Sequence, residues 1–220
     1  MVEGMDDSLV ISGDEIALLG LDDWRTLQSK LHARFRTRTF ATGLRFVNAI
    51  AEVAEEMNHH PDIDLRYAHV QVALISHDVG GKTARDVRLA RRISEIAAEI
   101  GAESEPHLLT LVEIGLDTWN APEVLPFWRA ILASPDNDKG EVIDPLGFAP
   151  LIWFQDTDEH ATPRQRWHFD IWVPLDEADA RIAAACAAGG TVVDAREAPS
   201  FTVLADQQGN RVCICTHDGR

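Results

Sequence analysis

The chain has 220 residues, of which 45% are hydrophobic, and it carries a formal net charge of −16. This length fits one large domain or two domains of about 100 residues each. The charge argues against binding to nucleic acid or to an anionic membrane surface, because both would repel the protein. Small molecules and protein surfaces are therefore the expected partners.

The cysteine content and the start of the chain indicate a compartment. Three cysteines, Cys186, Cys213 and Cys215, are too few for a disulfide framework. The first residues are acidic and polar, and no apolar run approaches the length that crosses a bilayer. We therefore expect a protein of the reducing cytoplasm that does not insert into a membrane.

Residues 9 to 57 predict a short helix, a hairpin and a long helix. Ser12-Gly-Asp-Glu15 matches the capping box that begins many helices. Alternating apolar and polar residues flank residues 28–30, which is the pattern of a β-hairpin. Apolar residues then recur with helical spacing over residues 39–57, so a helix is expected to cover the hairpin. The core face of that helix is expected to comprise Phe40, Leu44, Val47, Ile50, Ala51, Ala54 and Met57.

The next elements complete an α+β domain. Pro61 ends the long helix, and residues 63–67 and 70–75 are predicted to form two further strands. Thr83-Ala-Arg-Asp86 is a second capping box, and the helix that it begins is expected to end at Gly101. This order of elements predicts a four-stranded antiparallel sheet with helices on one face.

Residues 102–106 are polar and end in proline, which is typical of a linker. We therefore expect two domains, residues 1–105 and 106–220. The second domain contains a weak internal repeat, in which a strand, a helix and further strands occur twice. Its two helices are expected near residues 122–132 and 176–188. The expected strands cover residues 112–117, 142–143, 151–155, 168–173, 191–193, 201–204 and 212–215.

A group of polar residues lies where helices and strands of the first domain are expected to end, and catalytic groups often collect at such ends. The group comprises Glu55, Asn58-His59-His60-Pro61, Tyr67, Ser76-His77-Asp78 and Thr83-Ala-Arg-Asp86. This spacing resembles the signature of the pterin-4a-carbinolamine dehydratase family, which is a Glu, three intervening residues, His-His-Pro, five more residues, an aromatic residue, and a later His and Asp. The resemblance covers residues 9–104.

The resemblance implies an enzyme that dehydrates 4a-hydroxytetrahydropterin to quinonoid dihydropterin without a metal or another cofactor. Hydroxide leaves C4a while N5 loses a proton, so the reaction needs groups that exchange protons, and histidine titrates nearest to neutral pH. His59 and His77 are expected to be general acids that act on the leaving hydroxyl from the two faces of the ring. His60 is expected to hold the pterin, with Glu55 and Asp86 in support. The resemblance also implies a homodimer or homotetramer.

Structural explanations compete with these roles. A His-His-Pro run can simply close a helix, where cations interact favourably with the last carbonyl groups. Asp86 occupies the third position after Thr83 and would cap its helix with or without a ligand. Glu55 has charged neighbours and fits a solvated helix face. A metal site is a further alternative, although adjacent histidines at a helix end point in different directions, which is unfavourable for binding a single ion.

The second half resembles the glyoxalase-like branch of the vicinal-oxygen-chelate superfamily, which is built from paired βαβββ modules. Residues 205–213 fit the Asp-Pro-x-Gly-Asn hairpin of that family, with Gln207 in place of proline. The resemblance implies metal ligands at the positions of Glu113, His168 and Cys213, and such a set could bind a metal. Because a glutamate is usual at the position of Cys213, a fold without a metal is favoured.

The sequence leaves three functional hypotheses. The first is a pterin-4a-carbinolamine dehydratase with an appended glyoxalase-like domain of unknown ligand. The second is a non-catalytic module that binds a pterin or forms dimers. The third is a metal-dependent lyase or dioxygenase activity in the second half. The intact histidine motif favours the first.

Overall fold

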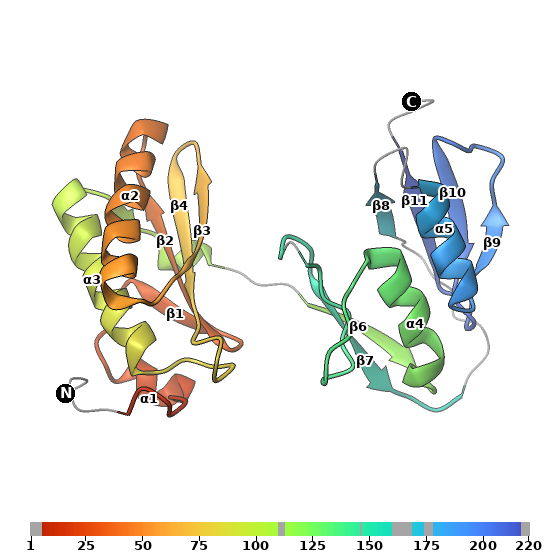
Figure 1. Ribbon diagram of the computed structural model, residues 1–220, viewed down its shortest axis with the longest axis horizontal. Helices are drawn as coiled ribbons and strands as arrows, with labels where there is room; N and C mark the ends of the chain where they lie inside the picture. The colour runs from red at the N-terminus through yellow and green to blue at the C-terminus, as the bar shows by residue number, and fades with distance from the viewer. Residues whose placement is uncertain (1–5, 110–112, 146, 160–168, 174–177, 217–220) are drawn as a thin grey trace. The chain divides into compact units, whose positions relative to one another are not determined.

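The computed structural model describes residues 6–109, 113–145, 147–159, 169–173 and 178–216. The chain forms two compact units, Met1–Leu111 and Val112–Arg220 (Figure 1). Each unit has a hydrophobic core of its own. Within the described ranges, every helix is too short or too polar to cross a lipid bilayer.

The first unit is an antiparallel sheet with helices on one face, as the sequence predicts (Figure 1). The strand order is β1-β2-β4-β3, and a short strand β5 pairs with β2 beyond the end of β1. On β4 the buried residues alternate with partly exposed ones, because only one face of the sheet is covered. The elements of this unit are α1 (Gly13–Ala17), β1 (Trp24–Leu27), β2 (Lys30–Arg36), α2 (Phe40–Met57), β3 (Asp62–Arg66), β4 (His69–Leu74), α3 (Ala84–Ile100), β5 (Glu103–Ser104) and the 3-10 helix η1 (Pro106–Leu108).

Local signals determine where the helices of this unit begin and end. The capping box that starts at Ser12 is present, and so is the one that links Thr83 to Asp86 at the start of α3. Gly101 ends α3 in the left-handed conformation, with φ of 75°. Asn58 ends α2 in the same conformation, with φ of 45°, so the chain already leaves the helix before Pro61.

The core face of α2 differs from the expected one. Ile50 and Ala54 are buried as predicted, but Phe40 and Leu44 are 50% and 46% exposed. The residues of α2 that are buried are Gly43, Phe46, Ile50, Val53 and Ala54. Val47 and Met57 also pack against the core, so the expected face is partly confirmed. It was wrong at Phe40, Leu44 and Ala51, which are exposed, because the buried face is rotated toward Gly43 and Phe46.

Gly43 explains this rotation. A Cβ atom at this position would lie 2.6 Å from Cδ1 of Leu65 and 3.2 Å from Oγ1 of Thr37. The missing side chain thus lets α2 approach the sheet closely along the line of Gly43. Because a glycine adds nothing to an apolar pattern, periodicity alone favours the neighbouring stripe of Phe40 and Leu44.

The segment that was expected to be a linker belongs to the first unit. Glu103 pairs with Arg36 in the sheet, and its side chain forms an ion pair with Arg38. The Glu105 carboxylate lies 3.1 Å from Nε of Arg34, and its backbone N–H donates to the Arg34 carbonyl at 2.8 Å. These contacts hold residues 103–105 against β2. The assignment of residues 1–105 and 106–220 as the two domains stays a prediction.

The second unit contains the repeated strand and helix pattern. In its second module, the described residues form β8, α5 and then three strands, in a sheet of order β8-β11-β10-β9. In the described part of the first module, β6 and β7 pair in parallel, and Val142 forms an isolated bridge with Ile152. The elements are β6 (Glu113–Thr118), α4 (Ala121–Leu132), β7 (Leu151–Asp156), β8 (Phe169–Trp172), α5 (Ala178–Ala187), β9 (Thr191–Asp194), β10 (Phe201–Ala205) and β11 (Arg211–Cys215).

The hairpin between β10 and β11 is held by Asp206. Its buried carboxylate accepts hydrogen bonds from the indole of Trp128 at 3.1 Å and from the backbone and side chain of Asn210 at 2.9 and 2.8 Å. Gln207, which stands where the family motif has proline, donates to the Glu123 carbonyl at 2.9 Å. This hairpin therefore anchors α4 to the sheet.

Candidate active site

His59 is buried because of the way in which α2 ends. Its backbone N–H donates to the Ala54 carbonyl at 3.0 Å, which is the bond expected after a left-handed residue such as Asn58. This turn directs the imidazole inward, where its side chain is only 8% exposed. Nε2 of His59 lies 2.8 Å from Oδ1 of Asp86.

Asp86 is fully buried and serves both as a helix cap and as the partner of His59. Its Oδ2 accepts hydrogen bonds from the Thr83 backbone N–H at 2.7 Å and from Oγ of Ser76 at 2.7 Å. Burial by itself would raise the pKa of Asp86, but the hydrogen bonds from His59, Thr83 and Ser76 outweigh it and keep the pKa below its ordinary value. The carboxylate is therefore charged at neutral pH.

The charge on Asp86 determines the tautomer of His59. An ionised carboxylate can only accept hydrogen bonds, so the proton in this contact must be on Nε2 of His59. Among the described residues, Nδ1 has no hydrogen-bond partner. Nδ1 is thus the ring atom that can exchange a proton with a ligand.

His60 and Glu55 form a second, exposed pair. Nε2 of His60 lies 3.1 Å from Oε1 of Glu55, and the side chains are 55% and 78% exposed. The two adjacent histidines thus point in different directions, as the sequence analysis expects of residues at a helix end.

His77 is exposed in a turn that follows β4. The preceding residue, Ser76, bonds to Asp86, so the backbone at His77 is connected to the partner of His59. Asp86 thereby joins the two sequence segments that carry His59 and His77.

Sequence reasoning gave no role to Ser76 or Lys82. The hydroxyl groups of Ser76 and Thr83 lie 2.8 Å apart, and both residues are buried beside Asp86. Lys82 is also buried, and its ammonium group is 3.4 Å from the Gln28 carbonyl. Burial lowers the pKa of Lys82, and the negative charge of Asp86 offsets this only in part. The available signal was their position in sequence, since Ser76 directly precedes His77 and Lys82 directly precedes the second capping box.

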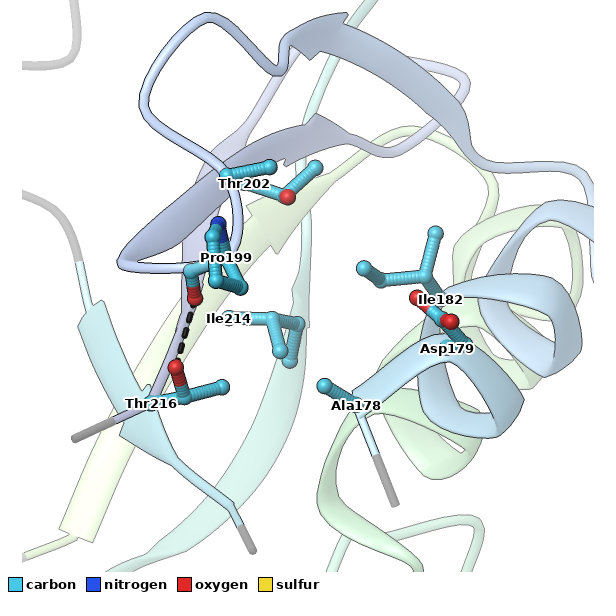
Figure 2. Close-up of a pocket in the computed structure, with 8 residues that line it drawn as sticks. Ala178, Asp179, Ile182, Pro199, Thr202, Ile214 and Thr216 are labelled. Carbon is cyan, nitrogen blue, oxygen red and sulfur yellow. Dashed lines mark hydrogen bonds between the residues drawn. The ribbon is translucent and has the colours of Figure 1, made fainter. Parts of the chain in front are cut away.

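The second unit has a pocket of about 130 Å³ between α5 and the strands β10 and β11 (Figure 2). Ile182 and Ile214 form apolar walls, and the hydroxyl of Thr216 donates to the Pro199 carbonyl at 2.6 Å. Because Ile182 and Ile214 also pack in the core, the pocket lies on the helix-covered side of the sheet. The full lining is Ala178, Asp179, Ile182, Ala198, Pro199, Thr202, Ile214 and Thr216.

The possible metal ligands of the second half remain a prediction. His168 lies outside the described residues, and so does the side chain of Glu113. Cys213 is buried on β11, beside Asp170 of β8 in the register of the sheet. Among the described residues, no group of three His, Cys, Asp or Glu side chains could hold a metal ion.

Comparison with known proteins identifies the first unit. The family model for pterin 4 alpha carbinolamine dehydratase matches residues 11–96. A protein of Thermomicrobium roseum that is provisionally named pterin-4-alpha-carbinolamine dehydratase is 37% identical to this chain over 94 residues. The match covers 97% of that protein and 43% of this chain. The chain belongs to the pterin-4-alpha-carbinolamine dehydratase family. The family match includes all five candidate residues of the histidine motif.

A second family model, for a glyoxalase-like domain, matches residues 113–215. Among solved structures, a transcriptional coactivator/pterin dehydratase from Brucella melitensis is 28% identical to this chain, with a TM-score of 0.39. The match covers 40% of this chain and 99% of the Brucella chain. A glyoxalase/bleomycin resistance protein from Albidiferax ferrireducens is 16% identical to this chain, with a TM-score of 0.38. That match covers 49% of this chain and 98% of the Albidiferax chain. The family model over residues 113–215 shows that this dehydratase family member carries a glyoxalase-like domain as its second part.

The lowered pKa of Asp86 predicts a specific pH dependence of stability. The pKa of Asp86 is lower in the folded protein than in the unfolded chain, where it is about 4. The ionised carboxylate therefore stabilises the fold at pH values above about 4, and this stabilisation is lost as the pH falls through the pKa of the folded state. We expect Asp86→Asn to be less stable than wild type at pH 7 and to lose less stability on acidification. Urea unfolding between pH 3 and 7 measures this, with the buried Trp24 indole N–H, bonded to Ser94, as the NMR reporter of the first unit.

Glu56→Gln is the matched control, because Glu56 is an exposed carboxylate of α2. Its stability should follow the wild-type curve. Parallel curves for wild type and Asp86→Asn would contradict the assignment of a stabilising charge to Asp86.

Proposed function

We propose that the first unit dehydrates 4a-hydroxytetrahydropterin to quinonoid dihydropterin by histidine acid and base catalysis. The observation that carries the proposal is the buried contact of 2.8 Å between His59 and Asp86, within a domain of the dehydratase family. A carboxylate that bonds to one nitrogen of an imidazole fixes the orientation of the ring and leaves the other nitrogen for proton transfer. The proposal also takes the cytoplasm as the site of action, as the small number of cysteines predicts.

In this proposal His59 is the principal general acid. Protonated His59 donates from Nδ1 to the hydroxyl that leaves C4a, while Asp86 accepts the hydrogen bond from Nε2 and stabilises the cation. Water forms when the C4a–O bond breaks and the oxygen takes this proton. N5 releases its proton to solvent water, and neutral His59 takes up a proton from solvent before the next turnover, so no proton is consumed overall.

His77 and His60 have the remaining roles. His77 is exposed beside Ser76 and acts as the second acid, from the other face of the pterin ring. His60 is exposed and paired with Glu55, so it contacts the pterin without the buried carboxylate that supports His59. Because only His59 has that support, it should contribute more than His60.

We also propose that the protein forms homo-oligomers through α2. Phe40 and Leu44 are half exposed, and the exposed Ala51 continues the same apolar stripe. Exposed apolar stripes of this kind mark interaction surfaces. A second copy offers an identical stripe, which suits a two-fold interface.

Substitution of the histidines tests the catalytic proposal. We expect His59→Ala and His77→Ala each to lower kcat for water loss from enzymatically generated 4a-hydroxytetrahydropterin by about 10²- to 10⁴-fold. His60→Ala should mainly raise KM. His107→Ala is the control, because His107 is exposed on η1 and lies outside the motif. A wild-type protein that binds a pterin but gives no acceleration would be a binding module instead of an enzyme.

A charge on the α2 stripe tests self-association. Leu44→Lys should shift the protein to a smaller species in light scattering coupled to size exclusion, because burying an ammonium group in an apolar interface is unfavourable. Glu52→Lys introduces the same group on the exposed face of α2 away from the stripe and should leave the mass unchanged. Equal masses for wild type and Leu44→Lys would argue against this interface.

A further inference from the structure

His77 lies between two residues that are both held by the first turn of α3. On one side, Oγ of Ser76 donates to Oδ2 of Asp86 at 2.7 Å. On the other side, Oδ1 of Asp78 accepts from Nη2 of Arg85 at 2.6 Å. Arg85 and Asp86 are adjacent in sequence, so one turn of helix holds both neighbours of His77.

Backbone hydrogen bonds make the segment that carries His77 a closed turn. The N–H groups of Val79 and Gly80 donate to the Ser76 carbonyl at 3.1 and 2.9 Å. The Ser76 N–H donates to the Gly81 carbonyl at 3.0 Å. A displacement of Asp78 would therefore move the whole turn, including His77.

Arg85 is well placed to hold this turn. Its side chain is 25% exposed, whereas that of Asp78 is 67% exposed. The Arg85 backbone N–H donates to Oγ1 of Thr83 at 3.2 Å, and its Nε lies 3.4 Å from the same oxygen. Contacts with Thr83 thus hold both the backbone and the guanidinium group of Arg85. The hydrogen bond from Arg85 also lowers the pKa of Asp78, so the pair is charged at neutral pH.

We propose that Arg85, acting through Asp78, is a positioning residue that holds His77 for reaction with the pterin. The inference rests on the proposed function, because it assigns a purpose to the geometry of His77. Exposed ion pairs contribute little to stability, so the value of this pair lies in orientation. A displacement of a reacting group by about 1 Å can lower a rate about 10²-fold. The first turn of α3 would then hold both proposed acids in position, His59 through Asp86 and His77 through Arg85.

A double-mutant cycle on the full chain tests this inference. The kcat for water loss from 4a-hydroxytetrahydropterin is measured for wild type, Arg85→Gln, His77→Ala and the double variant. We expect Arg85→Gln to lower kcat about 10-fold or more with little change in KM. It should have almost no further effect when His77 is already alanine. Arg85→Lys should recover part of the rate, because it restores a cation near Asp78.

Arg92→Gln is the matched control, because Arg92 also lies on α3 and pairs with an exposed carboxylate, that of Glu95, at 2.6 Å. It should leave kcat unchanged. Amide hydrogen exchange reports the turn directly, and Arg85→Gln should speed exchange at Val79 and Gly80 while the interior of α3 keeps its protection. Unchanged protection of α3 would show that Arg85→Gln displaces the turn that carries His77 without unfolding the first unit.

Two results would overturn the inference, and they differ from failure of the proposed function. The positioning role alone would be overturned if the wild type is active and Arg85→Gln lowers kcat by the same factor with His77 present as with His77→Ala. Unchanged exchange at Val79 and Gly80 in Arg85→Gln would do the same. A wild type that gives no acceleration would overturn the proposed function and this inference together.

Discussion

The first unit depends on one buried carboxylate. A charged group without contact to water is stable in a protein only if hydrogen bonds replace its hydration. Asp86 meets this condition through His59, the Thr83 N–H and Ser76, all within 2.8 Å. These donors come from the end of α2, the start of α3 and the turn after β4. One charge therefore brings together the three segments that form the candidate site.

Packing places His59 within reach of this charge. Gly43 lets α2 lie close to the sheet, and the left-handed Asn58 turns the chain so that His59 points inward. The same turn leaves His60 in solvent. Two adjacent histidines of identical chemistry thus have different environments, and only one of them can be supported by a buried carboxylate.

Much of the first fold follows from local signals in the sequence. Capping boxes at Ser12 and Thr83 and the glycine at 101 act over a few residues, and the structure confirms all three. The buried face of α2 did not follow from local signals, because it depends on how closely Gly43 approaches Leu65 on another element. The pairing of β5 with β2 likewise joins residues that are far apart in sequence, such as Arg36 and Glu103.

The candidate site was predictable in its residue types but not in its geometry. The histidine motif identified His59, His60 and His77 as a group. It could not reveal that His59 is buried and the other two are exposed, since burial is set by tertiary packing. Asp86 is a helix cap, as one of the two explanations from the sequence has it, and it also contacts His59, while its support of catalysis stays a proposal. Ser76 was named in the group without a role, because the sequence does not show that its hydroxyl bonds to Asp86.

The central claim is that ionised Asp86 holds His59 with its proton on Nε2 and leaves Nδ1 for the substrate. Long-range proton–nitrogen NMR of the imidazole rings at neutral pH tests this most directly. The account predicts that neutral His59 is the Nε2–H tautomer and that Asp86→Asn reduces this preference. A neutral His59 with its proton on Nδ1, unchanged by Asp86→Asn, would contradict it.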